Sequence, residues 1–297
     1  MREVTNAVPM STSRQLFRLS VLAILACALV YAVALGTHWG LHADERAFPT
    51  GTGGPTWERA HVALRRAVDT IHVATVILAA GAAAAAALWR RRFDLAAVAI
   101  ATLTGANLTT QLLKPLLAHA DPLGGEAARG IEASFPSGHA TAAMSLALVA
   151  VIVAPRRWRG WVSVVAAGYA ACVGVGLVAI FAHYPSDVVG GYLVAGAWAA
   201  AMSAIALASR ERGDPAAVRI PAPPAGTVFV LVGLGLAAAA LLLIPASHLH
   251  HGVFAVSAVA IAALALMLPV GLTVVLAGVT RASGEGSPPS SARPARR

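Results

Sequence analysis

Apolar runs of about 20 residues, separated by short polar segments, make up most of this 297-residue chain. An α-helix of that length spans the hydrocarbon core of a bilayer, which is roughly 30 Å thick. The pattern therefore predicts an all-α integral membrane protein with about eight transmembrane helices. The eight runs cover residues 16–37, 68–89, 94–113, 138–154, 161–182, 187–208, 226–246 and 253–277.

The polar segments divide the chain into five parts. Residues 1–15 form an N-terminal segment, residues 16–208 a six-helix membrane domain, and residues 226–277 a hairpin of two further helices. Residues 209–225 link the domain to the hairpin, and the Ser-, Pro- and Arg-rich residues 278–297 are expected to form a disordered tail.

Two segments near the N-terminus need separate interpretation. The first run contains Ala32-Val33-Ala34, which has the small-x-small form of a signal-peptide cleavage site. We favour an uncleaved helix because the run is long enough to span a bilayer. Residues 38–67 are rich in glycine, proline and charge, so we expect a loop there, with a short interfacial helix from Thr56 to Arg66.

The distribution of basic residues predicts the orientation of the helices. With eight spans and the N-terminus inside, sixteen of the 22 lysines and arginines fall in the inner segments. Basic residues are enriched in cytoplasmic segments of membrane proteins, so both termini are expected to be cytoplasmic. The segments around Lys114, Pro136 and His183 then lie at the outer face.

Composition indicates a membrane protein rather than a soluble domain or a nucleic-acid-binding protein. The chain is 58% hydrophobic and 12% charged, with a mean hydropathy of +0.73, whereas soluble domains carry about 25% charged residues. The net charge of +9 does not indicate nucleic-acid binding, because the charges form short clusters between apolar runs. Cys27 and Cys172 lie inside apolar runs and indicate neither a metal site nor a disulfide framework.

Two polar motifs at the starts of apolar runs carry the candidate chemistry. Pro136-Ser137-Gly138-His139 is a good helix start, where free N–H groups and the helix dipole favour a phosphate, and His139 could donate a proton. His183 and Asp187 are four residues apart and share one face of a helical turn, so the carboxylate can orient the imidazole for nucleophilic attack. Lys114, the only lysine, precedes both motifs.

Together these residues resemble the signature of the type 2 phosphatidic acid phosphatase (PAP2) superfamily, over roughly residues 60–208. The resemblance implies a six-helix PAP2-like core, followed here by two C-terminal helices. It also implies that His183, oriented by Asp187, forms a phosphohistidine and that His139 protonates the leaving group. Lys114 and the N–H groups of Ser137, Gly138 and His139 would hold the phosphate, without a metal or other cofactor.

The chain departs from the family signature at two arginines that bind phosphate. The family's Arg-Pro pair corresponds to Asp121-Pro122 here, and the second arginine corresponds to Leu177. Bidentate arginine contacts to phosphate are strong and geometrically specific, so their replacement affects the expected affinity and rate. His119 and Arg129, in the same loop as Asp121, are the candidates to replace them.

The sequence thus predicts a multi-pass cell-membrane phosphatase, whose site faces the periplasm or the extracellular side. Its substrate would be a lipid phosphate or diphosphate of the polyprenyl or phospholipid type. Two alternatives remain: an inactive lipid-phosphate-binding or partner protein of the same fold, and a lipid transporter. The sequence names neither the lipid nor the role of the last two helices, and it leaves homo-oligomerisation open. Asp69 and His72, near the outer end of the second run, either face water or support the site.

Overall fold

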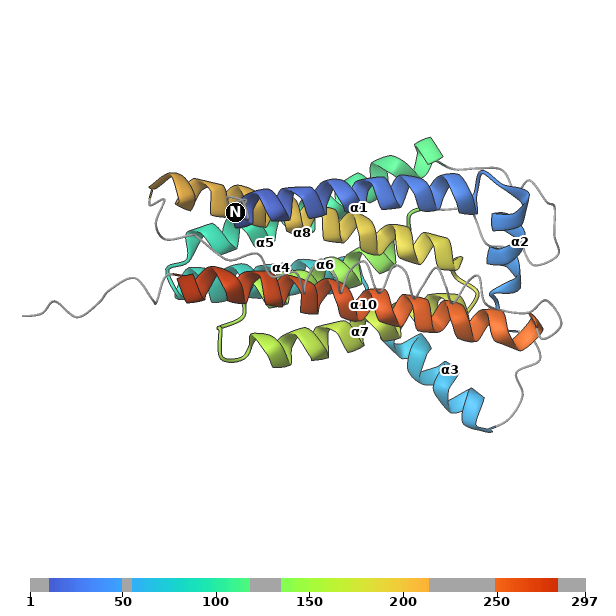
Figure 1. The fold of residues 1–297 in the computed structure, drawn as a ribbon. Helices are drawn as coiled ribbons and strands as arrows, with labels where there is room; N and C mark the ends of the chain where they lie inside the picture. Colours follow the sequence, from blue (N-terminus) through green and yellow to red (C-terminus); the bar gives the residue numbers. More distant parts are fainter. Residues whose placement is uncertain (1–10, 50–54, 118–134, 214–248, 283–297) are drawn as a thin grey trace, which may run out of the picture.

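The computed structural model describes residues 11–49, 55–117, 135–213 and 249–282, and all regular structure within these ranges is α-helical. The expectation of an all-α protein is therefore confirmed for the described residues. In the labelling of Figure 1, the helices are α1 (Thr12–Ala34), α2 (His38–Arg46), α3 (Pro55–Val68), α4 (Val73–Trp89), α5 (Phe93–Leu117), α6 (Gly138–Val153), α7 (Arg159–Ala179), α8 (Pro185–Gly213) and α10 (Leu249–Ala282).

Several of these helices are suited to a bilayer. Helices α1, α5, α7, α8 and α10 are long and apolar enough to cross a membrane, and the bent pair α3–α4 would add a sixth crossing. The predicted run 138–154 corresponds to α6, which has 16 residues, and the predicted run 226–246 lies outside the described residues. A multi-pass membrane protein is supported, whereas eight spans and cytoplasmic termini stay predictions.

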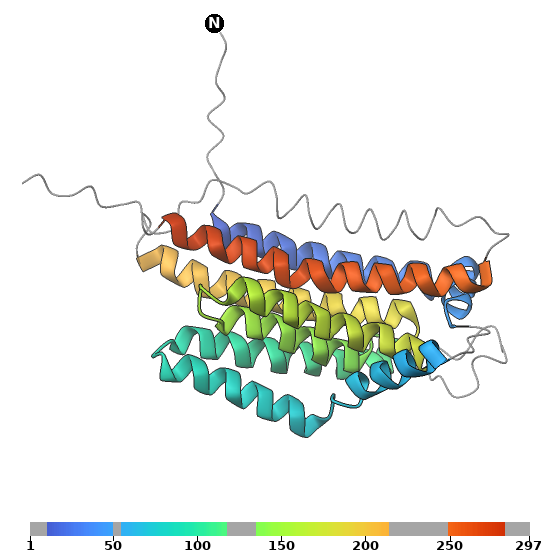
Figure 2. The same ribbon diagram turned by 90° about the horizontal axis from the view of Figure 1, so that it is seen from below.

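The long helices lie side by side, so the bundle has two ends (Figures 1 and 2). At the first, which we call the site end, α5 and α7 finish and α6 and α8 begin. At the second, which we call the arginine end, Arg90–Arg92 connect α4 to α5, and Arg156, Arg157 and Arg159 lie where α6 leads into α7. Helix α1 begins and α10 finishes at the arginine end (Figure 1).

Helix α6 lies in the middle of the bundle, in contact with α4, α5, α7, α8 and α10. Twelve of its 16 residues are buried, which is expected of a helix that is apolar on all sides. The neighbouring helices therefore enclose α6 in protein and hold its N-terminus at a defined place near the site end. Close contacts such as that of Gly174 in α7 with Tyr192 in α8 bring these helices together around it.

The polar segment before the second apolar run folds differently from our expectation. We expected residues 38–67 to be a loop with one short helix, and that helix is present as α3. The remainder is not all loop, because His38–Arg46 form α2, whose N-cap Thr37 accepts a hydrogen bond from Gly40 at 3.0 Å. The expected helix over residues 68–89 is interrupted at residues 69–72, and α3 and α4 meet there at 65°.

Other helices are longer than the apolar runs that predicted them. Helix α5 continues through Lys114 and Pro115 to Leu117, although we expected the loop to begin at Lys114. Helix α8 reaches Gly213 and α10 reaches Ala282, so each extends past the predicted end of its run into polar residues. Hydropathy marks the part of a helix that suits lipid, and a helix can continue beyond that part into water.

Candidate active site

A buried serine caps the N-terminus of α6. Ser137 Oγ accepts a hydrogen bond from the N–H of Ala140 at 3.3 Å, and Ser137 is fully buried. Its own N–H donates to the backbone carbonyl of Asp187 at 2.9 Å, which joins the start of α6 to the start of α8. We expected this N–H to bind phosphate, but Asp187 already accepts it. The N–H groups of Gly138 and His139 follow in the first turn, where an α-helix supplies no backbone acceptor.

Lys114 approaches this helix start from α5. A Cβ atom placed on Gly138 would lie 3.4 Å from Nζ of Lys114 and 3.4 Å from Nε2 of Gln111. The ammonium group therefore lies beside the backbone of Gly138, with no side chain of that residue in between. Gln111 and Lys114 are three residues apart in α5, so they share one face of the helix. Sequence reasoning missed Gln111, for which the i, i+3 spacing to Lys114 was the available signal.

The second motif places a histidine against a carboxylate at the start of α8. Nδ1 of His183 lies 3.3 Å from Oδ2 of Asp187, and the same oxygen accepts a hydrogen bond from the N–H of Tyr184 at 3.3 Å. His183 is 8% exposed and Asp187 1% exposed, so the pair is largely shielded from water. A carboxylate at Nδ1 fixes the orientation of the ring, so Nε2 is the nitrogen that could attack a phosphate or take a proton.

The backbone before His183 turns at Phe181, whose φ is 59°. The carbonyl of Leu177 accepts hydrogen bonds from the N–H groups of Ala182 at 2.9 Å and His183 at 3.2 Å. Leu177 stands where the family resemblance places an arginine, and its side chain is buried in the core. This position therefore supports the turn through its backbone and offers no charge to a phosphate.

The two candidate catalytic imidazoles lie close together at the site end. The ring centroids of His139 and His183 are 6.4 Å apart, with 53° between the ring planes. Lys114, His183 and the exposed His72 are all near enough to act electrostatically on His139. A group exchanges a proton with a ring nitrogen from about 3 Å away. Because the two rings are separated by about twice that distance, one phosphate between them can reach both.

A carboxylate that sequence reasoning missed reaches this site from α2. Asp44 accepts hydrogen bonds from the Ser186 N–H at 3.3 Å and from the Ser186 hydroxyl, directly beside Asp187. Asp44 keeps part of its surface exposed, but protein atoms surround its carboxylate, and this burial raises its pKa to about 7. The nearby charge of Asp187 raises the pKa further, while the bonds from Ser186 oppose the rise. A lone aspartate in a polar segment gave no sequence signal of this contact.

Some predicted site residues lie outside the described part of the chain. These are His119 and Arg129, together with Asp121. Within the described ranges, no group of three or more histidine, cysteine, aspartate or glutamate side chains is arranged to hold a metal ion. The described site therefore consists of Lys114, Gly138, His139 and the His183–Asp187 pair.

Comparison with models of known protein families identifies one match. The model described as the PAP2 superfamily matches residues 95–211, which run from the first turn of α5 to the last turn of α8. The matched segment includes both polar motifs and Lys114. Comparisons with curated proteins and with solved structures gave no match.

Proposed function

Because the chain belongs to the PAP2 superfamily through residues 95–211, we propose that it is a membrane phosphatase that hydrolyses a lipid phosphate or diphosphate. One observation carries the proposal: His139, the His183–Asp187 pair and Lys114 meet at one end of an apolar helix bundle. Binding alone would not need a second histidine beside one that a carboxylate orients. Two imidazoles that share a phosphate suit nucleophilic and acid–base catalysis.

In the first step, Nε2 of His183 attacks phosphorus. The N–P bond forms as the bond from phosphorus to the leaving oxygen breaks, and His139 gives that oxygen a proton. Asp187 holds Nδ1 of His183 at 3.3 Å and stabilises the positive charge that develops on the ring. The products are the lipid alcohol, or a lipid monophosphate if the substrate is a diphosphate, and a phosphohistidine.

In the second step, water attacks the phosphohistidine and His139 accepts the proton from that water. The N–P bond breaks, inorganic phosphate leaves, and His183 returns to its starting state. Lys114 and the N–H groups of Gly138 and His139 stabilise the charge on the phosphate oxygens in both steps. Fixed donors of this kind are each worth on the order of 10²–10³ in rate in enzymes where they have been removed.

An apolar groove beside the site supports a lipid substrate. It has a volume of about 620 Å³ and lies between α1, α5 and α8. Phe135, which directly precedes Pro136, lines it, as do Leu113 and Leu117 on either side of Lys114. A hydrocarbon tail in this groove would bring its phosphate to Lys114. We therefore place the substrate among polyprenyl or phospholipid phosphates, and we place the site at the periplasmic or extracellular face from the arginine distribution.

The test is phosphate release by the detergent-purified chain from polyprenyl diphosphate, polyprenyl monophosphate and phosphatidic acid, each with EDTA present. Release should persist in EDTA and fall at least about 10³-fold in His183→Ala, because the nucleophile is lost. His38→Ala is the matched control, since His38 is exposed in the first turn of α2 and is not part of the proposed site.

Each contrary result points to a different function. Release that disappears in EDTA would reject the metal-independent mechanism. A folded protein that binds one of these lipids but releases no phosphate would be a lipid-phosphate-binding protein. Lipid movement between leaflets that vanadate and His183→Ala leave unchanged would indicate a transporter, because vanadate mimics the pentavalent phosphorus of hydrolysis.

A further inference from the structure

Four arginines gather at the arginine end of the bundle, opposite the candidate active site. Arg90, Arg92 and Arg156 are each close enough to Arg159 for their positive charges to repel its guanidinium group. They come from the connection between α4 and α5 and from the segment between α6 and α7. The two connections are more than 60 residues apart in the sequence but lie at the same end of the bundle (Figure 2), so like charges come together there.

Two of these arginines are fixed by the end of α6. Arg90 Nη1 donates to the carbonyl of Val153 at 2.7 Å, and Arg159 Nε donates to the carbonyl of Val151 at 3.2 Å. These bonds orient the guanidinium groups at the C-terminus of α6, whose dipole is equivalent to only about half a negative charge and so offsets only part of their positive charge. A positive cluster that is held in place in this way is ready to bind an anion.

Few acidic residues lie near the cluster. Asp94 pairs with Arg92 at 3.3 Å and also with Arg210, so its one charge is shared by two guanidinium groups. The other carboxylate at this end of the described chain, Glu211, accepts hydrogen bonds from Ser13 in α1. The cluster therefore keeps a net positive charge that a ligand can neutralise.

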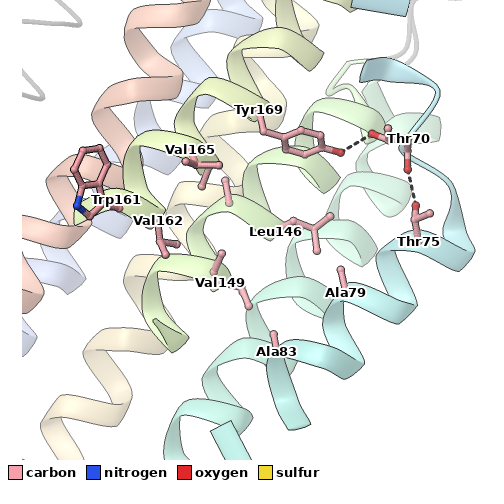
Figure 3. Close-up of a pocket in the computed structure, with 13 residues that line it drawn as sticks. Thr70, Thr75, Ala79, Ala83, Leu146, Val149, Trp161, Val162, Val165 and Tyr169 are labelled. Atoms are coloured by element: carbon pink, nitrogen blue, oxygen red, sulfur yellow. Dashed lines mark hydrogen bonds between the residues drawn. The ribbon is translucent and has the colours of Figure 1, made fainter. Parts of the chain in front are cut away.

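An apolar groove of about 640 Å³ lies between α4, α6 and α7, and its lining on α7 starts two residues after Arg159 (Figure 3). At the arginine end it is lined by Trp161, two residues after Arg159, and by Ala150, one turn before Val153. At its other end Tyr169 and Thr70 form a hydrogen bond of 2.8 Å between their hydroxyl groups. The polar lining residues, Thr70, Thr75 and Tyr169, thus lie away from the arginines.

The length of the groove matches one leaflet of a bilayer. From Trp161 to Tyr169 it follows eight residues of α7, or about 12 Å at the rise of an α-helix. One leaflet contributes roughly 15 Å of the hydrocarbon core. Trp161, which lines the arginine end of the groove, and Trp158, one turn earlier in the chain, are both exposed, as tryptophans often are at the membrane–water boundary.

We propose that this cluster and groove bind one anionic phospholipid from the leaflet at the arginine end. Its phosphate would contact Arg90, Arg156 and Arg159, and one acyl chain would occupy the groove between α4, α6 and α7. Basic pockets between transmembrane helices recognise anionic head groups in this way. The site is separate from the catalytic one, because the two lie at opposite ends of the same helices (Figure 1).

Native mass spectrometry can test this on the full chain in detergent with added dioleoyl phosphatidylglycerol or dioleoyl phosphatidylcholine. One molecule of the anionic lipid should bind about tenfold more tightly than the zwitterionic lipid. The double variant Arg90→Gln/Arg156→Gln should remove this preference, while glutamine retains an N–H donor for the Val153 carbonyl. Arg14→Gln/Arg18→Gln is the matched control, since it removes two exposed charges at the same end but on α1, away from α4, α6 and α7.

A second pair of variants tests the groove without changing any charge. Ala150 is exposed and lines the groove, so Ala150→Phe should fill it and weaken binding of the anionic lipid. Ala82→Phe, at an exposed position of α4 that does not line the groove, should have no effect. Equal binding of the two lipids would overturn the proposal. So would an anionic preference that Arg90→Gln/Arg156→Gln and Arg14→Gln/Arg18→Gln reduce equally, or binding that Ala150→Phe leaves unchanged.

Discussion

Replacing Gly138 with alanine would place a methyl group where we propose that a phosphate oxygen binds. The new Cβ would lie 3.4 Å from Lys114 Nζ and 3.4 Å from Gln111 Nε2, which is at the limit of ordinary van der Waals contact. Both neighbours are the ends of flexible side chains, so they can move slightly to accept the methyl group. The fold therefore has room for alanine at this position, but the proposed phosphate site does not.

These distances indicate how much Gly138→Ala should change the rate of phosphate release and the stability of the fold. An oxygen bound to Nζ lies about 2.8 Å from it, so an oxygen shared by Nζ and the Gly138 N–H would meet the methyl group and move on the order of 1 Å. A displacement of that size at a reacting group lowers rates by about 10²-fold. Stability should change by no more than about 1 kcal/mol, the usual difference between glycine and alanine in a helix.

The assay measures phosphate release and thermal unfolding on the same preparation of Gly138→Ala. Gly168→Ala is the matched control, because Gly168 lies in α7 with nothing within 4 Å of an added Cβ. It should keep full activity and raise the melting temperature slightly. Wild-type activity in Gly138→Ala would refute the placement of the phosphate beside Gly138. Loss of activity together with a large fall in melting temperature would refute the geometric argument that alanine fits.

Three further predictions concern the start of α8 and its contacts. In Gly191→Ala, the Cβ would lie 2.7 Å from the carbonyl oxygen of Ser137 and 3.0 Å from the backbone nitrogen of Thr141, so we expect a loss of about 1–3 kcal/mol, and an unchanged melting temperature would contradict it. Asp187→Asn should lower kcat by about 10²–10⁴-fold with little change in KM, because the amide orients His183 poorly; a change below threefold would argue against the pairing. The pKa of Asp44 is about 7 in the folded chain against an ordinary value of 3.8, so the folded state holds the extra proton and stability should fall as pH rises from about 4 through about 7. Asp44→Asn should weaken that dependence in melting curves recorded across this range, and an identical dependence in the variant would assign it to other groups.

The positions of the helices could largely be predicted from the sequence. Backbone polar groups in lipid must be satisfied internally, so a long apolar run there has little choice but to be helical. The runs 94–113, 161–182 and 187–208 accordingly appear as α5, α7 and α8. The chemistry of the site was also visible, because Ser137 and Gly138 have the local properties of a helix start and His183 and Asp187 have helical spacing.

The break between α3 and α4 was missed, although three of its four residues, Asp69, Thr70 and His72, are polar. We placed Asp69 and His72 near the outer end of a single run, whereas they lie at a turn where the backbone bends by 65° and where Val68 and Ile71 are buried. The packing of α3 against α7 accompanies this bend, with Gly176 facing the backbone of Leu64. Such a contact depends on which helices become neighbours, and hydropathy along one run carries no information about that.

The sequence by itself determined which segments are apolar enough to suit a membrane and which residues carry the candidate chemistry, because hydropathy and short spacings are local properties. Tertiary structure alone decided the connections between distant residues. Asp44 meets Ser186 although 142 residues separate them, and the Asp187 carbonyl takes the N–H of Ser137. Arg90 and Arg159 likewise come together at the end of α6. Each of these contacts exists because folded helices bring their ends together, and the side chains involved show no partner until that packing is formed.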